Sequence, residues 1–433
     1  MLITMETNIS SLNSTETEKM INCQEPGVLG IVAEYNPFHN GHLYQMREAV
    51  KITGCQAVVC AMSGNFVQRG QAALIDKWER AGIAIDCGAD LVIEIPVFCC
   101  LSNAGIYAKG GVSLLNSLGM VTHLAFGSES GDSGKLKEIA ELLERYEVEI
   151  SEKTGTLSRN GMSWPAARSE AFSQVTGSEY QLPSDSNDIL ALEYIRTVNQ
   201  LESRLKIVPV KRVGPGYNDT ADSDPGNIFQ SATGIRKLLA EGENTGKFVP
   251  PASEKRIFQI TPEELRQREN RYFDLLRYKI LMSDEAVFAK LPDGGEGIGN
   301  RLKKAVRSAE SIEELIGLTK SRRYTYTHVS RLLMELLVET DRKMKDPAYI
   351  RVLAMNSRGR KLLKDSVKNG RNTLPVITNV NKTLRRLDES DENDRKIRYQ
   401  LMTEVRGTDV YNLITGRELY KNSDRVRSLV PAR

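Results

Sequence analysis

The sequence predicts an α/β fold with a parallel sheet over roughly its first 250 residues, followed by a mostly α-helical C-terminal region. Two observations carry this prediction. Up to about residue 213, short apolar runs alternate with segments of helical periodicity, a pattern typical of a parallel sheet covered by helices. From Thr261 onward, helix-forming residues dominate and strand signals are few. At 433 residues, the chain is long enough for two or three domains.

The first unit is a buried strand that leads into a helix. Residues 28–35 form a nearly unbroken apolar run after Gly27, which is typical of a strand covered on both faces. Asn36 and Pro37 end the run, because proline removes a backbone donor and restricts the residue before it. From His42 onward, apolar residues recur at helical spacing, at Leu43, Met46, Ala49 and Val50. A strand-to-helix turn is therefore predicted between them.

The alternation continues through four more strands and four more helices. A strand, a helix, a strand, a helix, a strand, two helices and a strand are predicted, in that order, at 57–62, 77–87, 90–95, 102–118, 123–126, 135–146, 182–201 and 207–213. In such sheets, ligands bind at the carboxyl ends of the strands, and the first strand-to-helix turn lies at such an end.

The C-terminal region is expected to be helical, with helices including 312–318, 329–340, 349–355 and 401–413. Pro251 follows a glycine-rich stretch and marks a boundary between a nucleotide-binding domain, 27–250, and a helical region, 251–433. Residues 1–26 are polar and lack the apolar segment of a secretory signal, so they are interpreted as a disordered extension or as the result of a start site placed too early, Met20 being another possible start.

Composition and charge narrow the classes of function. No window approaches about 18 apolar residues, so no membrane partner is expected. The cysteines fall in the first quarter without a C-x-x-C pair, which favours buried thiols in a reducing cytoplasm. Residues 1–250 hold 21 Lys and Arg against 30 Asp and Glu, a net charge of −9, whereas residues 251–433 hold 38 against 26, or +12. A basic C-terminal region points to a polyanion such as nucleic acid, although a solvated basic helical surface is the alternative.

The turn after the first strand carries the pattern His39-Asn40-Gly41-His42. Backbone amides at a helix N-terminus favour an anion, and Gly41 allows phosphates to approach the backbone closely. Two imidazoles three residues apart can face the same ligand and donate hydrogen bonds to a phosphoryl group as its charge develops. This motif predicts a site that binds a nucleoside triphosphate.

Further polar residues stand where the predicted sheet would place ligand contacts. Ser231, Thr233 and Arg236 open a helix and could hold a second phosphate, or Ser231 could simply cap the helix. Lys77 begins a helix and is a candidate cation for a polyphosphate. Gly127, Asn187 and Arg212 lie at strand or helix ends, where contact with a nucleotide and an ordinary capping or surface role are equally open.

Two basic segments in the C-terminal region are candidates for RNA contact. The first interleaves cations with aromatic residues at Arg322, Arg323, Tyr324 and Tyr326, which suits phosphate contact combined with base stacking. The start of an amphipathic helix is the alternative. The second surrounds Gly359 with the cations Arg358, Arg360, Lys361 and Lys364.

From residue 30 to the C-terminus, the chain resembles the bacterial tRNA(Met) cytidine acetate ligases, a family of the H-x-G-H nucleotidylyltransferase superfamily. H-x-G-H alone indicates only the superfamily, whereas the longer string that begins at Glu34 is more specific. The resemblance is carried by EYNPFHNGHLYQ, MSGNFVQRG, DKWERA, GADLVIEIP, FGSE, NDILALEYI, GYND, SATGIRK and RRYTYTHVSRLLM. Ala191 departs from the glycine expected in its motif, and the N-terminal extension is longer than the family requires.

The resemblance implies a Rossmann-like domain that activates acetate with ATP, releases pyrophosphate and transfers the acetyl group to the wobble cytidine of elongator tRNA(Met), giving N(4)-acetylcytidine. Mg²⁺ is the expected companion of ATP, and no metal site of the protein itself is expected. His39 and His42 would contact the phosphates, with Lys77 as a further catalytic residue, and the helical region would bind the tRNA. The implied ATP-binding residues are Val32, Ala33, Glu34, Tyr35, Asn36, Pro37, Phe38, His39, Asn40, Gly41, His42, Leu43, Tyr44, Gln45, Gly127, Asn187, Arg212, Ser231, Thr233 and Arg236.

Two other functions remain open from the residues alone. An adenylyl- or cytidylyltransferase that acts on a small molecule would use the same phosphate site, but would not need a basic surface. A catalytically inactive RNA-binding protein on this fold would need the basic surface, but not the intact His39, Gly41 and His42.

Overall fold

The computed structural model describes residues 27–177, 179, 181–213, 226–295, 297–321, 324–427 and 429–431. Within them, one twisted sheet runs in the order β10-β8-β5-β2-β1-β6-β7, with β9 paired to β8. Its strands are β1 (Val28–Ala33), β2 (Ala57–Ser63), β5 (Leu91–Ile95), β6 (His123–Ser128), β7 (Lys206–Lys211), β8 (Ile350–Met355), β9 (Val376–Ile377) and β10 (Val430–Pro431). The five strands β5, β2, β1, β6 and β7 are parallel, which confirms the predicted α/β fold.

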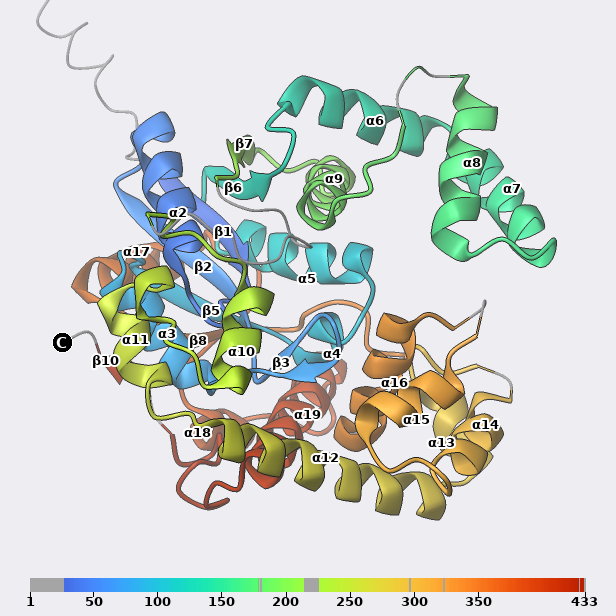
Figure 1. Cartoon of the computed structure of the whole chain (residues 1–433). Helices are drawn as coiled ribbons and strands as arrows, with labels where there is room; N and C mark the ends of the chain where they lie inside the picture. Colours follow the sequence, from blue (N-terminus) through green and yellow to red (C-terminus); the bar gives the residue numbers. More distant parts are fainter. Residues whose placement is uncertain are drawn as a thin grey trace, which may run out of the picture.

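Helices cover both faces of this sheet (Figure 1). Strand side chains alternate between two cores: Val28 and Val32 pack in the first, and Leu29 and Ile31 in the second. The first core is closed by α5 (Ala104–Ser117), α6 (Ser133–Arg145) and α9 (Ser186–Gln200). The second core is closed by α2 (Asn40–Thr53), α3 (Lys77–Asp86), α10 (Ala232–Glu241) and α11 (Pro251–Ile257).

Several shorter elements connect these layers. The hairpin β3 (Phe66–Val67) and β4 (Gln71–Ala72) follows β2, and α4 (Val97–Cys100) follows β5. The pair α7 (Glu147–Arg159) and α8 (Trp164–Thr176) projects from the end of α6 (Figure 1). A single 3-10 turn, η1 (Gly246–Phe248), precedes α11.

The C-terminal helices form a third core beside the sheet (Figure 1). It is built by α12 (Pro262–Met282), α13 (Glu285–Lys290), α14 (Ile298–Ala305), α15 (Ile312–Thr319) and α16 (Tyr326–Val338). The long α19 (Glu392–Thr415) packs against α12 and α16 and also touches α4. In the sequence, α17 (Ser357–Lys368) follows β8, and α18 (Val380–Leu384) follows β9.

The prediction of a helix at 349–355 is wrong, because these residues include β8. A short, mostly apolar segment does not distinguish a buried strand from a buried helix turn, and the sequence does not show the partners of Arg351, which interrupts it. β8 pairs antiparallel with β5, so the C-terminal region completes the sheet of the N-terminal one. The boundary at residue 250 therefore does not separate two independent cores.

Other features of the described residues agree with the sequence. Cys55, Cys60, Cys99 and Cys100 are buried free thiols, as predicted. No helix in the described ranges is both long and apolar enough to cross a membrane. The expected extension at 1–26 lies outside the described residues.

Candidate active site

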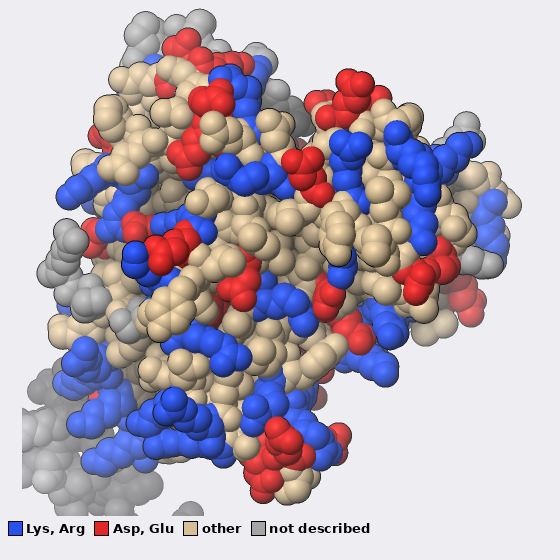
Figure 2. All heavy atoms as spheres, turned by 90° about the horizontal axis from the view of Figure 1, so that it is seen from below, with Lys and Arg blue, Asp and Glu red and all other residues tan. Residues whose placement is uncertain are grey.

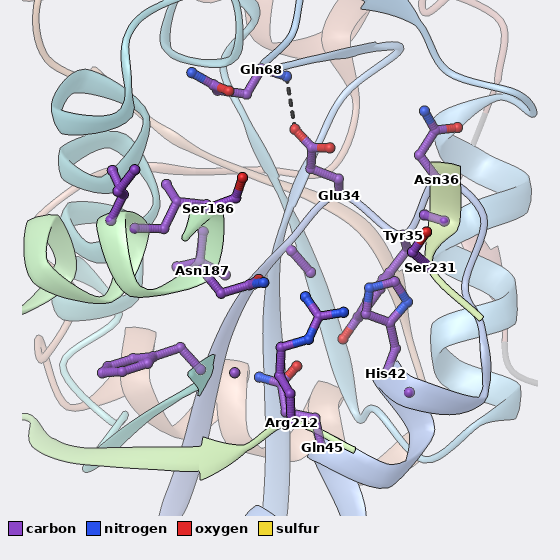
Figure 3. Close-up of a pocket in the computed structure, with 18 of the residues that line it drawn as sticks. Glu34, Tyr35, Asn36, His42, Gln45, Gln68, Ser186, Asn187, Arg212 and Ser231 are labelled. Carbon is purple, nitrogen blue, oxygen red and sulfur yellow. Dashed lines mark hydrogen bonds between the residues drawn. The ribbon is translucent and has the colours of Figure 1, made fainter. Parts of the chain in front are cut away.

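A cavity of about 570 Å³ opens at the carboxyl ends of β1, β6 and β7. Figure 3 shows side chains from β1, the β1–α2 turn, α9 and the segment after β7 converging on it. Its wall is completed from the C-terminal region by Thr327 and Arg331 of α16. The cavity is thus shared between the parallel sheet and the basic helical region.

The H-x-G-H turn forms the N-terminus of α2. His39 is the N-cap residue, and its Nδ1 accepts a hydrogen bond from the Gly41 backbone N–H at 3.1 Å. The Nδ1 of His42 accepts in return from the His39 backbone N–H at 3.2 Å, and the two rings stack with centroids 3.7 Å apart. A Cβ on residue 41 would lie 2.9 Å from the His39 ring, so only glycine fits here.

This geometry determines what the two imidazoles can donate. Because each Nδ1 accepts a backbone N–H, each neutral ring must carry its proton on Nε2. Burial, aided by the nearby Arg212 and Arg236, lowers the pKa of His39 to about 3. Burial, His39 and Arg212 likewise hold the pKa of His42 well below its usual value. Both rings are therefore neutral hydrogen-bond donors at physiological pH.

The second phosphate motif lies beside the first. Ser231 lines the cavity and caps α10, its Oγ accepting from the Gly234 N–H at 3.1 Å. Arg236 donates to the backbone oxygen of Asn36 at 2.7 Å and to Thr233 Oγ1 at 3.1 Å. Thr233 and Arg236 do not line the cavity; Arg236 instead ties the start of α10 to the β1–α2 turn.

On the opposite wall, two carboxylates connect the segment after β6 with the start of α9. Asn187 donates to Glu129 Oε1 at 2.6 Å, and Arg212 approaches the same oxygen at 3.8 Å. Asp188 accepts the backbone N–H groups of Glu129 and Ser130, each at 3.1 Å. Asn187 and Arg212, together with Gly127, line the cavity.

Most of the segment 32–45 also faces the cavity. Val32, Ala33, Glu34, Tyr35, Asn36, His39, Gly41, His42, Tyr44 and Gln45 line it. The remaining four, Pro37, Phe38, Asn40 and Leu43, do not. Phe38 is fully buried in the core, and Asn40 donates to the backbone oxygens of Ile228 and Lys247, so both support the turn from behind.

Lys77 is not brought to the cavity, which corrects its assignment as a catalytic contact. Its Nζ lies 2.7 Å from Glu94 Oε1 and 2.8 Å from Asp424 Oδ2, and its side chain is fully buried. Arg351 completes this cluster at 3.1 Å from Glu94 and 2.7 Å from Asp424. We call these four residues the buried ionic cluster; it joins α3, β5, β8 and the segment after α19.

Several cavity residues were not identified from the sequence. Gln68 and Arg69 reach the cavity from the β3–β4 hairpin, and Arg331 from α16. Tyr107 and Tyr194 line it from α5 and α9. The hairpin belongs to the motif MSGNFVQRG, but a motif alone does not show which of its side chains face a cavity. Arg331 lies within an amphipathic helix pattern and gives no local signal of its position.

The predicted RNA contacts divide between two places. Tyr326, about half exposed, and the partly buried Tyr324 lie at the start of α16, beside the cavity residue Thr327. Arg322 and Arg323 lie outside the described residues. Arg358, Arg360 and Lys361 are exposed on α17, where Arg358 donates to the backbone of Gln56 before β2. The α17 cations therefore lie at the end of the strands opposite the cavity.

Basic side chains are also abundant elsewhere on the surface. Figure 2 shows Lys and Arg side chains spread over the face that lies at the bottom of Figure 1, with fewer acidic side chains among them. Such a surface suits a polyanion.

The fold and the cavity define a nucleotidylyltransferase of the H-x-G-H class. A family model described as HIGH Nucleotidyl Transferase matches residues 27–425. The chain belongs to this family and, within it, to the tRNA(Met) cytidine acetate ligases, as relatives of that name show.

Two of these relatives come from different bacteria. A tRNA(Met) cytidine acetate ligase of Clostridium perfringens (strain SM101 / Type A) is 37% identical over 79% of this chain and 87% of its own length. Its namesake from Caldanaerobacter subterraneus subsp. tengcongensis is also 37% identical, over 91% of this chain and 96% of its own length.

Two solved structures are similar to this chain over most of its length. Thermotoga maritima TmcAL bound with alpha-thio ATP has a TM-score of 0.80 and 30% identity, covering 94% of this chain and 100% of that chain. Its apo form has a TM-score of 0.81 at the same identity and coverage.

Proposed function

We propose that this protein is an ATP-dependent acetate ligase that acetylates N4 of the wobble cytidine in elongator tRNA(Met). The observation that carries the proposal is one cavity lined both by the H-x-G-H turn and by a helix of the basic region. The relatives named above supply the identity of the acyl group and of the acceptor RNA. Neither a small-molecule transferase nor an inactive RNA-binding protein accounts for both halves of this wall.

The first step would join acetate to AMP. A carboxylate oxygen of acetate attacks the α-phosphorus of ATP, and the bond to pyrophosphate breaks. Acetate is ionised near neutral pH and needs no base, so the protein must position the reactants and stabilise charge on the phosphates. The Nε2–H groups of His39 and His42, the N-termini of α2 and α10, and Arg212 would do so.

Mg²⁺ is proposed to arrive with ATP. Among the described residues, no group of three or more His, Cys, Asp or Glu side chains could hold a metal ion. The phosphates would therefore supply most of its oxygen ligands, as is common for Mg²⁺. When bound, the ion would neutralise part of the phosphate charge.

The second step would transfer the acetyl group to the RNA. Tyr324 and Tyr326 at the start of α16 are proposed to contact bases near the cavity, together with Arg322 and Arg323 of the same motif. Arg358, Arg360 and Lys361 are proposed to bind phosphates of a more distant part of the tRNA, because α17 lies at the other end of the strands.

One assay tests the proposal directly. Purified protein is incubated with ATP, labelled acetate and total tRNA, and the nucleosides are then analysed. Acetylcytidine that requires both ATP and acetate is the expected product. Pyrophosphate exchange that does not depend on acetate would favour a small-molecule transferase, and tRNA binding without exchange would favour an inactive binding protein.

The role of the histidines is tested by His39→Asn. Asparagine is a good helix cap but lacks the Nε2 donor, so the turn is preserved while a phosphate contact is lost. Acetate-dependent pyrophosphate exchange should fall about 10²- to 10³-fold, the usual effect of removing one transition-state donor. His123→Asn, at the start of β6 outside the cavity, is the matched control and should leave exchange unchanged.

A further inference from the structure

Glu34 is the only acidic side chain among the described residues that line the cavity. It directly follows β1, and the cations Arg69, Lys211, Arg212 and Arg331 share its cavity. ATP and acetate are both anions, and like charges brought close together near a protein surface repel one another. A carboxylate in this position therefore suits a hydrogen-bond donor rather than an oxygen of a phosphate or of acetate.

The surroundings of Glu34 leave one carboxylate oxygen available to a ligand. Its Oε1 accepts the backbone N–H of Gln68 at 2.8 Å, which fixes the orientation of the carboxylate (Figure 3). In the part of the chain that the structure describes, Oε2 makes no hydrogen bond, and no Lys, Arg or His nitrogen lies within salt-bridge distance. Within the same residues, Glu34 belongs to no group of three or more His, Cys, Asp or Glu side chains that could hold a metal ion. The available oxygen requires a hydrogen-bond donor.

Glu34 also lies at the end of the cavity where the basic region meets the sheet. Gln68 belongs to the β3–β4 hairpin, whose Gly70 has a φ of +76° and touches the backbone of α16 at Ser330 and Arg331. Ser330 Oγ donates to the Gly70 backbone oxygen at 3.3 Å, and Arg331 lines the same cavity. An RNA held by the helical region would reach the cavity from this end.

We propose that Glu34 binds the exocyclic amine of the acceptor cytosine and accepts its proton during acetyl transfer. This assignment rests on the proposed function. Carboxylates are the side chains that accept hydrogen bonds from cytosine N4, so the available oxygen matches the donor that this reaction brings. The hydrogen bond from Gln68 keeps the other oxygen in place.

The step is balanced. N4 attacks the carbonyl carbon of acetyl-adenylate, forming the C–N bond. The C–O bond to AMP breaks, and AMP leaves with its electron pair. One N4 proton passes to Glu34 Oε2. A positioned general base of this kind typically contributes about 10²- to 10⁴-fold to the rate.

The test is Glu34→Gln, which preserves the shape of the side chain and an oxygen that can accept from Gln68. Two measurements separate the steps. Hydroxylamine traps acetyl-adenylate as acetyl hydroxamate and reports on its formation, whereas synthetic acetyl-adenylate mixed with tRNA in a single turnover reports on transfer alone. The ratio of transfer to hydroxamate formation should fall at least 100-fold in Glu34→Gln. Glu138→Gln, an exposed position on α6, is the matched control and should not change it.

Two further measurements sharpen the result. Glu34→Asp should recover part of the transfer rate, because it keeps the carboxylate. Binding of tRNA should be unchanged in both variants, since Glu34 contacts one base. Equal losses in both steps would overturn the inference, because Glu34 would then act on ATP. Normal transfer in Glu34→Gln would also overturn it. If the wild type forms no acetate-dependent hydroxamate, the proposed function itself fails.

Discussion

Replacing Lys77 by methionine probes the buried ionic cluster. Lys77 lies between Glu94 and Asp424, and Arg351 contacts the same two carboxylates. The side chains of all four residues are at most 3% exposed. Two cations and two anions therefore balance one another out of contact with water. Methionine fills much of the lysine volume but leaves one negative charge without compensation.

The expected loss of stability follows from the free-energy cost of keeping that uncompensated charge buried. Removing one partner of a buried ion pair typically costs about 3–5 kcal/mol. Glu404 is a neighbour of the cluster, and burial together with the charge of Glu94 raises its pKa to about 8, which favours the neutral form of this carboxyl at neutral pH. Total stabilities of about 5–15 kcal/mol are usual, so Lys77→Met should lower the free energy of unfolding by a large part.

Chemical denaturation of Lys77→Met measures this loss, and limited proteolysis should detect earlier cleavage near Asp424. Lys51→Met is the control, because Lys51 is exposed and pairs only with Glu48. Adding Asp424→Asn should restore part of the stability, because it removes the one negative charge that Lys77→Met leaves uncompensated. Pyrophosphate exchange per folded molecule should be retained. A loss below about 1 kcal/mol would refute the energetic argument, and normal stability without exchange would return Lys77 to a catalytic role.

Two other predictions concern the histidine turn and the hairpin. His39 has a pKa of about 3 in the folded protein against 6.5 when unfolded, so the unfolded state binds more protons between these values. Stability should fall as pH decreases from about 6.5 towards 3, and urea titrations of His39→Asn should show a shallower decline; parallel curves would contradict this. Gly70→Ala should lower the thermal stability more than Gly54→Ala, because both glycines have positive φ but only a Cβ added at residue 70 would clash with the backbone of Arg331. Equal losses of stability in the two variants would show that the added Cβ at residue 70 is accommodated without a clash.

The parts of the fold that sequence analysis predicted depend on short stretches of chain. The strand, the proline and the helix around His39 and His42 are adjacent in sequence, so their pattern predicts the turn directly. The alternating strands and helices up to residue 213 follow for the same reason. Asn187 and Arg212 lie at the cavity because parallel strands carry their carboxyl ends to one edge of the sheet.

What sequence analysis did not predict depends on contacts between distant residues. Lys77 looks like a free cation at a helix start, and its partner Asp424 is 347 positions away. Arg351 interrupts the apolar residues of β8, and its partners come from β5 and the segment after α19, so the local sequence does not identify it as part of a buried strand. Glu34 falls inside a recognised motif, yet only the composition of the whole cavity wall shows it to be the one acidic side chain among the described lining residues.

The antiparallel pairing of β8 with β5 bears on how the protein is made. During synthesis, the nucleotide-binding strands leave the ribosome long before β8 and Asp424. Until then, β5 has an unpaired edge, and Lys77 and Glu94 lack their remaining partners. A shortened chain that ends before β8 would keep the phosphate-binding turn but lack the contacts that stabilise its sheet. The architecture thus disfavours a stable fragment that consumes ATP without an RNA acceptor, and ties the release of a reactive acyl-adenylate to the completed chain.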